Sequence, residues 1–115
     1  MATGPDQEIT PEERREWGRI IATVLQYYYV QLIKTIDVQE AANHLFGARI
    51  ITDNEHEMAV TAGHESSQTR AGKLIAILIN RVEANPHQFK AVCQALEQAG
   101  AESIINEIKG IHNKF

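Results

Sequence analysis

The sequence predicts an all-α fold, and three observations support this prediction. Apolar residues recur three and four positions apart along most of the chain, which is the spacing of one face of a helix. Capping signals precede several of these runs, and glycines follow them. No segment has the character of a strand, because Ile50–Ile51 is too short and Leu74–Ile79 fits a helix better.

Length and composition indicate one globular domain. The 115 residues are 43% apolar, which is enough for one core but not for two. The formal net charge of −4 argues against attraction of the whole molecule to nucleic acid or anionic lipid. The single cysteine, Cys93, fits a reducing compartment. The longest apolar run is too short for a bilayer and the first residues do not form a secretory signal, so we expect a cytoplasmic domain.

The first predicted helix starts at Thr10, after a lead-in over residues 1–9 that we expect to be disordered. Thr10 is a good cap, Pro11 suits the first helical position, and Glu13 completes a capping box. Helical spacing of apolar residues then continues to Ile36.

Such a helix is longer than a domain of this size needs. Without interruption it would extend about 36 Å at 1.5 Å per residue. We therefore predict a kink or a break, either at Gly18 or within Tyr27–Tyr29.

Two shorter helices are predicted next. The second helix begins at an Asp37 cap and ends at Gly47, and the third begins at a Thr52 cap and ends at Gly63. In each, a glutamate three positions after the cap gives the spacing of a capping box.

The fourth helix, over Thr69–Asn80, is the stretch around which we expect the domain to be built, and Ser66 or Ser67 caps it. Its inner face contains Ala71, Leu74, Ile75, Leu78 and Val82, and an adjoining stripe contains the bases Arg70, Lys73 and Arg81. Gly72 lies inside this helix, where a small residue allows a neighbouring helix to approach closely.

Two further helices complete the fold. Asn85 and Pro86 begin the fifth helix and Gly100 ends it, and Gly110 closes a last short helix. Short connections predict mostly antiparallel neighbours in a six-helix bundle over residues 10–110, with a C-terminal tail over 111–115.

No constellation of residues indicates catalysis. The five histidines have no metal-binding spacing, and the glycines at helix ends do not form a phosphate loop. Cys93 occupies an inward position where burial raises a thiol pKa. We therefore expect neither an enzyme nor a metal or other cofactor.

The charges are distributed unevenly along the chain. From Asp37 to Glu65 the only base is Arg49, against six acids, whereas the fourth helix contains three bases and no acid. A domain with separate acidic and basic ends can bind copies of itself head to tail, and a contact that does not close produces a filament. Ordinary solvated faces explain the same pattern equally well. At least one residue of Tyr27–Tyr29 must be exposed.

The order of these segments along the chain resembles that of a caspase recruitment domain of the death-fold superfamily. The resemblance is carried by I-D-V-Q-E-A-A-N-H-L-F, I-I-T-D-N-E-H-E-M, S-S-Q-T-R-A-G-K-L-I-A-I-L, F-K-A-V-C-Q-A-L and S-I-I-N-E-I, and it covers roughly Val24 to Gly110. It implies a six-helix Greek-key bundle with a long, bent first helix and no enzymatic activity. It also implies association with identical or related domains.

The resemblance also implies site residues. Arg70 matches the basic position at the start of the fourth helix, with Lys73 beside it, and Arg81 extends this basic face. The acidic face would consist of Asp37, Glu40, Asp53, Glu55 and Glu57. Two positions depart from the pattern: Tyr29 stands where a base is common in the first helix, and Asn43 where an acid is common in the second.

Our leading hypothesis is an adaptor or recruitment domain that assembles with other caspase recruitment domains in apoptotic or innate immune signalling. On this hypothesis Arg70→Glu abolishes assembly and leaves the fold intact. The alternative is a small helical domain that binds nucleic acid or a regulatory ligand through the basic stripe, although three bases on an acidic domain are few for phosphate binding. Pyrin and death-effector domains share the bundle and remain open as relatives.

Overall fold

The first helical segment is broken at Tyr28, the middle one of the three tyrosines. A computed structural model describes residues 10–61 and 65–112, and within them α1 spans Pro11–Tyr27 and α2 spans Tyr29–Thr35. Thr10 and Glu13 form the predicted capping box, with N···O distances of 3.0 and 2.9 Å. The predicted break is therefore confirmed at the tyrosines, whereas Gly18 lies within continuous helix.

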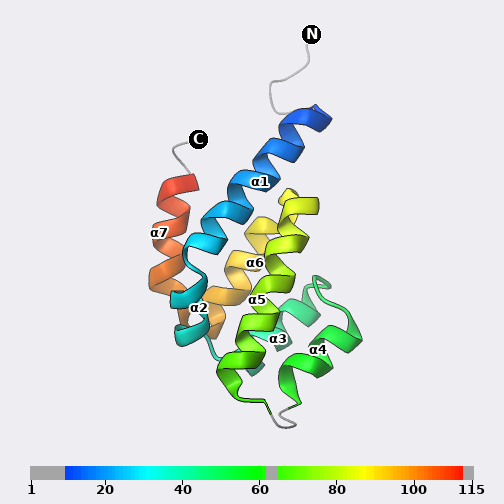
Figure 1. Cartoon of the computed structure of the whole chain (residues 1–115), viewed down its shortest axis with the longest axis vertical. Helices are drawn as coiled ribbons and strands as arrows, with labels where there is room; N and C mark the ends of the chain where they lie inside the picture. The colour runs from blue at the N-terminus through cyan, green and yellow to red at the C-terminus, as the bar shows by residue number, and fades with distance from the viewer. Residues whose placement is uncertain (1–9, 62–64, 113–115) are drawn as a thin grey trace.

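The remaining elements are helical as well, and no strand occurs in residues 10–61 and 65–112. They are α3 (Val38–Gly47), α4 (Asp53–Val60), α5 (Ser67–Ala84), the short 3₁₀ helix η1 (Pro86–Gln88), α6 (Phe89–Leu96), the π-helical turn η2 (Glu97–Ala101) and α7 (Glu102–His112). With α1 and α2 taken as one bent helix, the described residues form the predicted six-helix bundle (Figure 1).

Most predicted helix ends are confirmed. Ser66 caps α5 by accepting a hydrogen bond from the Thr69 amide at 3.1 Å, and Gly100 ends the fifth helix with a φ of 108°. The predicted end at Gly110 is wrong, because α7 continues to His112. Gly63 and residues 1–9, for which a helix end and a disordered lead-in were predicted, lie outside the described residues.

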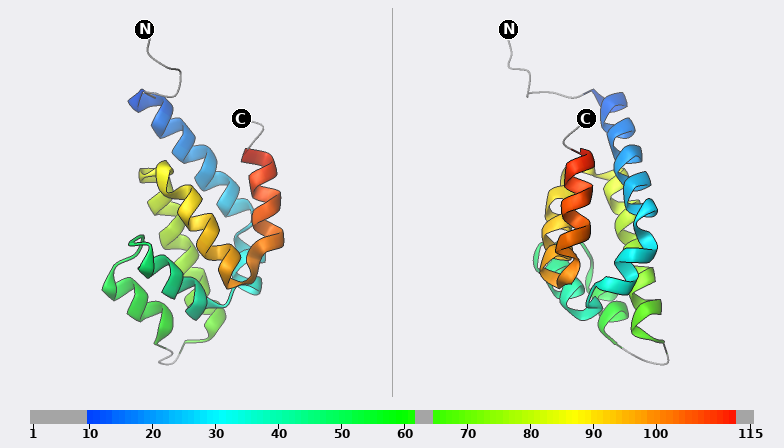
Figure 2. Two further views of the ribbon diagram at one scale, coloured as in Figure 1. Left: turned by 180° about the vertical axis from the view of Figure 1, so that it is seen from behind. Right: turned by 90° about the vertical axis from the view of Figure 1, so that its left-hand side faces the viewer.

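Helix α5 lies in the middle of the bundle, as the sequence predicted. It contacts α1, α2, α3 and α4, and α1 runs beside it in the opposite direction (Figures 1 and 2). Its inner face is buried and includes Leu74, Ile75, Leu78 and Val82. Burying each such side chain contributes about 1.5–3 kcal/mol, so this face is a main source of stability.

Two glycines allow α1 and α2 to approach α5 closely. A Cβ atom at Gly18 would lie 2.2 Å from the backbone oxygen of Glu83, and one at Gly72 would lie 2.8 Å from the Tyr29 hydroxyl. That hydroxyl donates a hydrogen bond to the Gly72 carbonyl at 3.3 Å. Gly72 therefore makes room for the Tyr29 side chain, whereas Gly18 allows the backbones of α1 and α5 to approach each other.

We expect Gly18→Ala to lower the free energy of unfolding by about 1–3 kcal/mol, because the added methyl group meets backbone rather than a movable side chain. Urea denaturation followed by circular dichroism measures this change. Gly110→Ala is the matched control. No atom lies within 4 Å of its added Cβ, so helix propensity should raise stability by up to about 1 kcal/mol. An equally stable Gly18→Ala variant would contradict the close approach.

Candidate interaction surface

All three bases predicted for the basic face contact other parts of the same chain. Arg81 forms an ion pair with Glu55, Lys73 forms one with Glu65, and Arg70 donates a hydrogen bond to the Ala59 carbonyl. Glu55 was predicted for the opposite, acidic face. The two faces therefore meet within one molecule, where α4 lies against α5 (Figure 1), and the prediction of two separated charged ends is wrong for Arg81 and Glu55.

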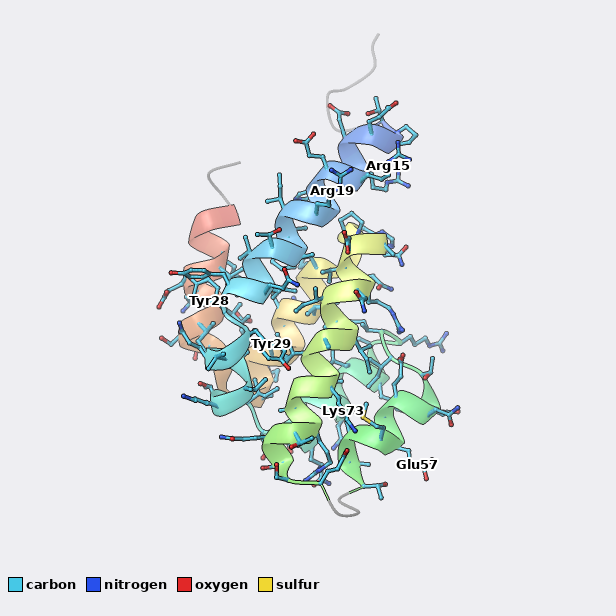
Figure 3. All side chains as sticks on the ribbon, viewed as in Figure 1. Arg15, Arg19, Tyr28, Tyr29, Glu57 and Lys73 are labelled. Atoms are coloured by element: carbon cyan, nitrogen blue, oxygen red, sulfur yellow. The ribbon has the colours of Figure 1, made fainter. Side chains whose placement is uncertain are left out.

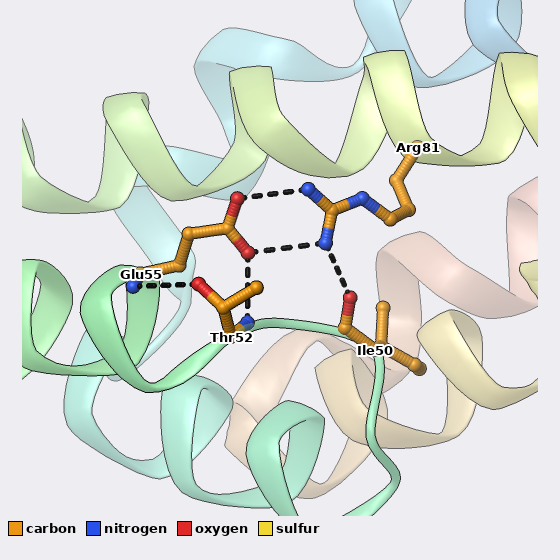
Figure 4. Close-up of polar contacts among 4 residues, drawn as sticks. All are labelled: Ile50, Thr52, Glu55 and Arg81. Atoms are coloured by element: carbon orange, nitrogen blue, oxygen red, sulfur yellow. Dashed lines mark hydrogen bonds and ion pairs between the residues drawn. The ribbon is translucent and has the colours of Figure 1, made fainter.

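Arg81 and Glu55 form a bidentate pair between α5 and the first turn of α4 (Figure 4). The Arg81 Nη1 atom lies 3.0 Å from Glu55 Oε1, and Nη2 lies 2.8 Å from Oε2. Nη1 also donates to the Ile50 carbonyl at 2.7 Å, and the Thr52 amide donates to Glu55 Oε1 at 2.9 Å. The side chains of Arg81 and Glu55 are only 30% and 22% exposed. Planar, bidentate and partly buried pairs of this kind are the stronger ones.

The pKa of Glu55 is lowered, mainly because Arg81 donates hydrogen bonds to its ionised carboxylate; partial burial opposes this effect, and the Thr52 amide adds to it. A lowered folded-state pKa stabilises the fold above the unfolded-state pKa of about 4.3. This stabilisation is lost as the pH falls through the folded-state value.

The connection between α3 and α4 contains a left-handed residue directly before Ile50, whose carbonyl accepts the hydrogen bond from Arg81. Arg49, after the end of α3, has a φ of 62°, a left-handed conformation that is uncommon outside glycine. The Ile50 amide then donates to the Leu45 carbonyl at 2.9 Å. The helix itself ends at Gly47, as predicted, and the left-handed residue follows two positions later.

Arg70 donates a hydrogen bond to a backbone carbonyl at the C-terminal end of α4. Its Nη1 atom lies 2.6 Å from the carbonyl oxygen of Ala59, one of the last carbonyls of the helix that lack an intrahelical partner. A cation at this position also interacts favourably with the helix dipole. Arg70 is half-buried, so Arg70→Glu should destabilise the fold. It is therefore not the neutral interface variant that the sequence suggested.

The other predicted site residues remain at the surface. Asp37, Glu40, Asp53 and Glu57 are exposed, and Asp37 also caps α3 by accepting from the Gln39 and Glu40 amides. Lys73 and its partner Glu65 are 50% and 40% exposed, so this ion pair contributes well under about 1 kcal/mol. Lys73 and Glu57 lie on the neighbouring helices α5 and α4 (Figure 3).

Some surface features were not identified from the sequence. Arg15 and Arg19 are exposed one turn apart on α1 (Figure 3). Helical spacing places Glu12 and Glu16 on the same side, so this turn has no net positive charge.

The tyrosine run has one exposed member, as predicted. Tyr27 is 76% exposed at the bend between α1 and α2, and the nearby Val30 is 54% exposed. Tyr28 is buried, and its hydroxyl donates a hydrogen bond to a Glu107 carboxylate oxygen at 3.2 Å; burial first, and then Glu107, raises the pKa of the phenol.

Tyr29 and Asn43, the two residues that depart from the family pattern, each contact a neighbouring helix. Tyr29 lies against Gly72 of α5, and Asn43 lies 2.8 Å from the His56 ring nitrogen Nε2. The His56 ring also packs on Phe46, with ring centroids 4.8 Å apart. Both residues therefore join neighbouring helices.

The described residues contain no group of three or more histidine, cysteine, aspartate or glutamate side chains placed to hold a metal ion. Burial raises the pKa of the Cys93 thiol to about 12, in the predicted direction. In the part of the chain that the structure describes, no helix combines the length and apolar character needed to cross a bilayer.

No family model matches this chain, and no curated protein or solved structure matches it either.

We expect Arg81→Met to lower the free energy of unfolding at pH 7 by about 1–3 kcal/mol, because it leaves the partly buried Glu55 carboxylate without its partner. As the pH falls through the lowered folded-state pKa of Glu55, the difference from wild type should shrink, because the carboxyl group then becomes protonated in both proteins. Urea denaturation at pH 7 and pH 3 measures both effects.

Lys73→Met is the control, since it removes an exposed ion pair and should cost less than about 1 kcal/mol at either pH. Equal losses in the two variants at pH 7 would show that the Arg81 pair has no special contribution.

Proposed function

We propose that this chain is an interaction domain of the caspase-recruitment type, which assembles with copies of itself or with related domains in apoptotic or innate immune signalling. The observation that carries the proposal is the six-helix bundle with a first helix broken at Tyr28 and packed along α5. This is the architecture that the sequence resemblance implies.

The residues that carry the resemblance also support the proposal. In the segments that match the second and fourth helices, the inward-facing apolar positions are buried, as a shared core requires, whereas Phe46 at the end of α3 is 40% exposed. The buried positions are Val38, Ala41, Ala42 and Leu45 of α3 and Ala71, Leu74, Ile75 and Leu78 of α5. The resemblance to a caspase recruitment domain therefore includes buried core positions as well as surface charges.

The intramolecular contacts narrow the surface available for assembly. Arg81, Glu55 and Arg70 hold α4 against α5, so their substitution affects the fold first. Lys73 remains a candidate because a carboxylate from another molecule can replace Glu65 at little cost. Asp53 and Glu57 are exposed on α4, and neither has an ion pair among residues 10–61 and 65–112.

Complementary charges on α4 and α5 suit contacts between copies. A symmetric contact closes into a dimer, whereas a head-to-tail contact that does not close continues into a filament. A single exposed ion pair is too weak to drive either, so assembly must repeat these contacts and also bury exposed apolar side chains. Large exposed apolar residues in the described part of the chain are Tyr27, Val30 and Phe46.

The alternative, binding of nucleic acid through the basic stripe, has less support. Two of the three guanidinium and ammonium groups of the stripe are hydrogen-bonded to carbonyl oxygens of the chain itself. A gel shift with short duplexes that decreases with salt would favour this alternative over the proposal.

Charge reversal tests the proposal. Lys73→Glu and Glu57→Lys should each weaken self-assembly by about tenfold or more, because each replaces an attraction by a repulsion at every repeated contact. An equimolar mixture of the two variants should recover assembly, since each reversed charge then meets its complement. Size-exclusion chromatography with light scattering across concentration and salt measures assembly, and negative-stain microscopy separates closed oligomers from filaments.

Lys90→Glu, an exposed reversal on α6, is the matched control and should assemble like wild type. All variants should keep the helical spectrum and melting temperature. A wild-type protein that stays monomeric in low salt at every accessible concentration would overturn self-assembly. Wild-type behaviour of both single variants would remove this surface from the proposal.

A further inference from the structure

A second candidate site lies on helices other than α4 and α5. It is a pocket of about 360 Å³ lined by Trp17 of α1, Pro86 and His87 of η1, Phe89 and Lys90 at the start of α6, and Lys109 of α7. Helix α7 lies beside α6 and beside α1 (Figure 2). The volume is within the range of pockets that hold small organic ligands.

The inner wall of the pocket is apolar. Pro86 and Phe89 are buried, and the Trp17 ring is half-buried. Cys93 completes this wall at 1% exposure, and its thiol stays uncharged at neutral pH because burial raises its pKa to about 12. This wall suits the apolar part of a ligand and offers it no charged group.

The charged groups of the pocket are at its rim, and they are basic. Lys90 and His87 are exposed, Lys109 is half-buried, and no acidic residue lines the pocket. Lys109 donates a hydrogen bond to Glu97 at 2.7 Å, so part of its charge is compensated. Lys90 has no ion pair among the described residues. One ammonium group is therefore available beside an apolar wall, with a second close to the same opening.

We propose that this pocket binds an amphipathic organic anion, a carboxylate with a medium-length aliphatic chain. The chain would occupy the wall formed by Trp17 and Phe89, and the carboxylate would lie at the rim beside Lys90, within reach of Lys109. Charge complementarity next to an apolar surface favours this ligand, because an anion matches the basic rim, whereas a cation with the same chain would be repelled by it. The inference does not depend on the proposed assembly.

Octanoate is a suitable probe, and Trp17 is its reporter because it is the only tryptophan of the chain. Octanoate should change the Trp17 fluorescence saturably with one site per chain. Octylammonium, which has the same chain and the opposite charge, should bind at least about tenfold more weakly. Absence of a saturable change with octanoate, or equal binding of the two probes, would overturn the proposal.

Substitutions locate the site. Lys90→Glu should weaken octanoate binding by about tenfold or more, because it places a carboxylate at the rim. Lys73→Glu makes the same change of charge on α5, outside the pocket, and should bind octanoate like wild type. For self-assembly the expected effects are opposite, since Lys73→Glu weakens assembly and Lys90→Glu does not. Failure of the pocket proposal can therefore be distinguished from failure of the assembly proposal.

Amide chemical shifts of the wild-type protein provide a test that needs no variant. Octanoate should shift the amides of Trp17, residues 87–93 and Lys109 more than those of α4. Shifts concentrated elsewhere, or an unchanged affinity in a folded Lys90→Glu variant, would contradict the assigned site.

Discussion

The arrangement of this bundle depends on close packing around α5. Helices α1, α2, α3 and α4 and the short helix η1 contact it. Helix α1 approaches its backbone at Gly18, where a Cβ atom would clash with Glu83, and the Tyr29 hydroxyl of α2 reaches Gly72. Because the inner face of α5 is apolar, these approaches bring large buried side chains together in the core. The break at Tyr28 allows the first helical segment to follow α5 along its length while changing direction.

Much of this architecture follows from local patterns. Capping residues such as Thr10, Thr52 and Ser66 act within three positions of themselves, so their effect is visible in the sequence. The left-handed conformation of Arg49 was not predicted, because a positive φ is expected at glycine and not at arginine. Gly110 was predicted as a helix end from its residue type, but packing of Ile104, Ile105 and Ile108 stabilises α7 around it.

The site was harder to predict, because the sequence shows which charges exist and not which ones meet. Arg81 and Glu55 are separated by 26 positions and looked like members of two opposing faces, yet they form one bidentate pair. Arg70 binds a backbone carbonyl, a partner that no charge pattern indicates. The surface proposed for assembly is therefore a smaller set around Lys73 and Glu57, and the pocket near Lys90 is on other helices.

Helix α4 differs from the rest of the bundle in how it is held. Ala59 is its only fully buried residue, and polar contacts from Arg70 and Arg81 fix its two ends. A helix held in this way has little apolar area to lose, so it can detach at a lower free energy than global unfolding. Its amide protons should therefore exchange with solvent ahead of those of α5, and a partner that replaced the two arginine contacts would capture an opened conformation in which part of the core beneath α4 is uncovered.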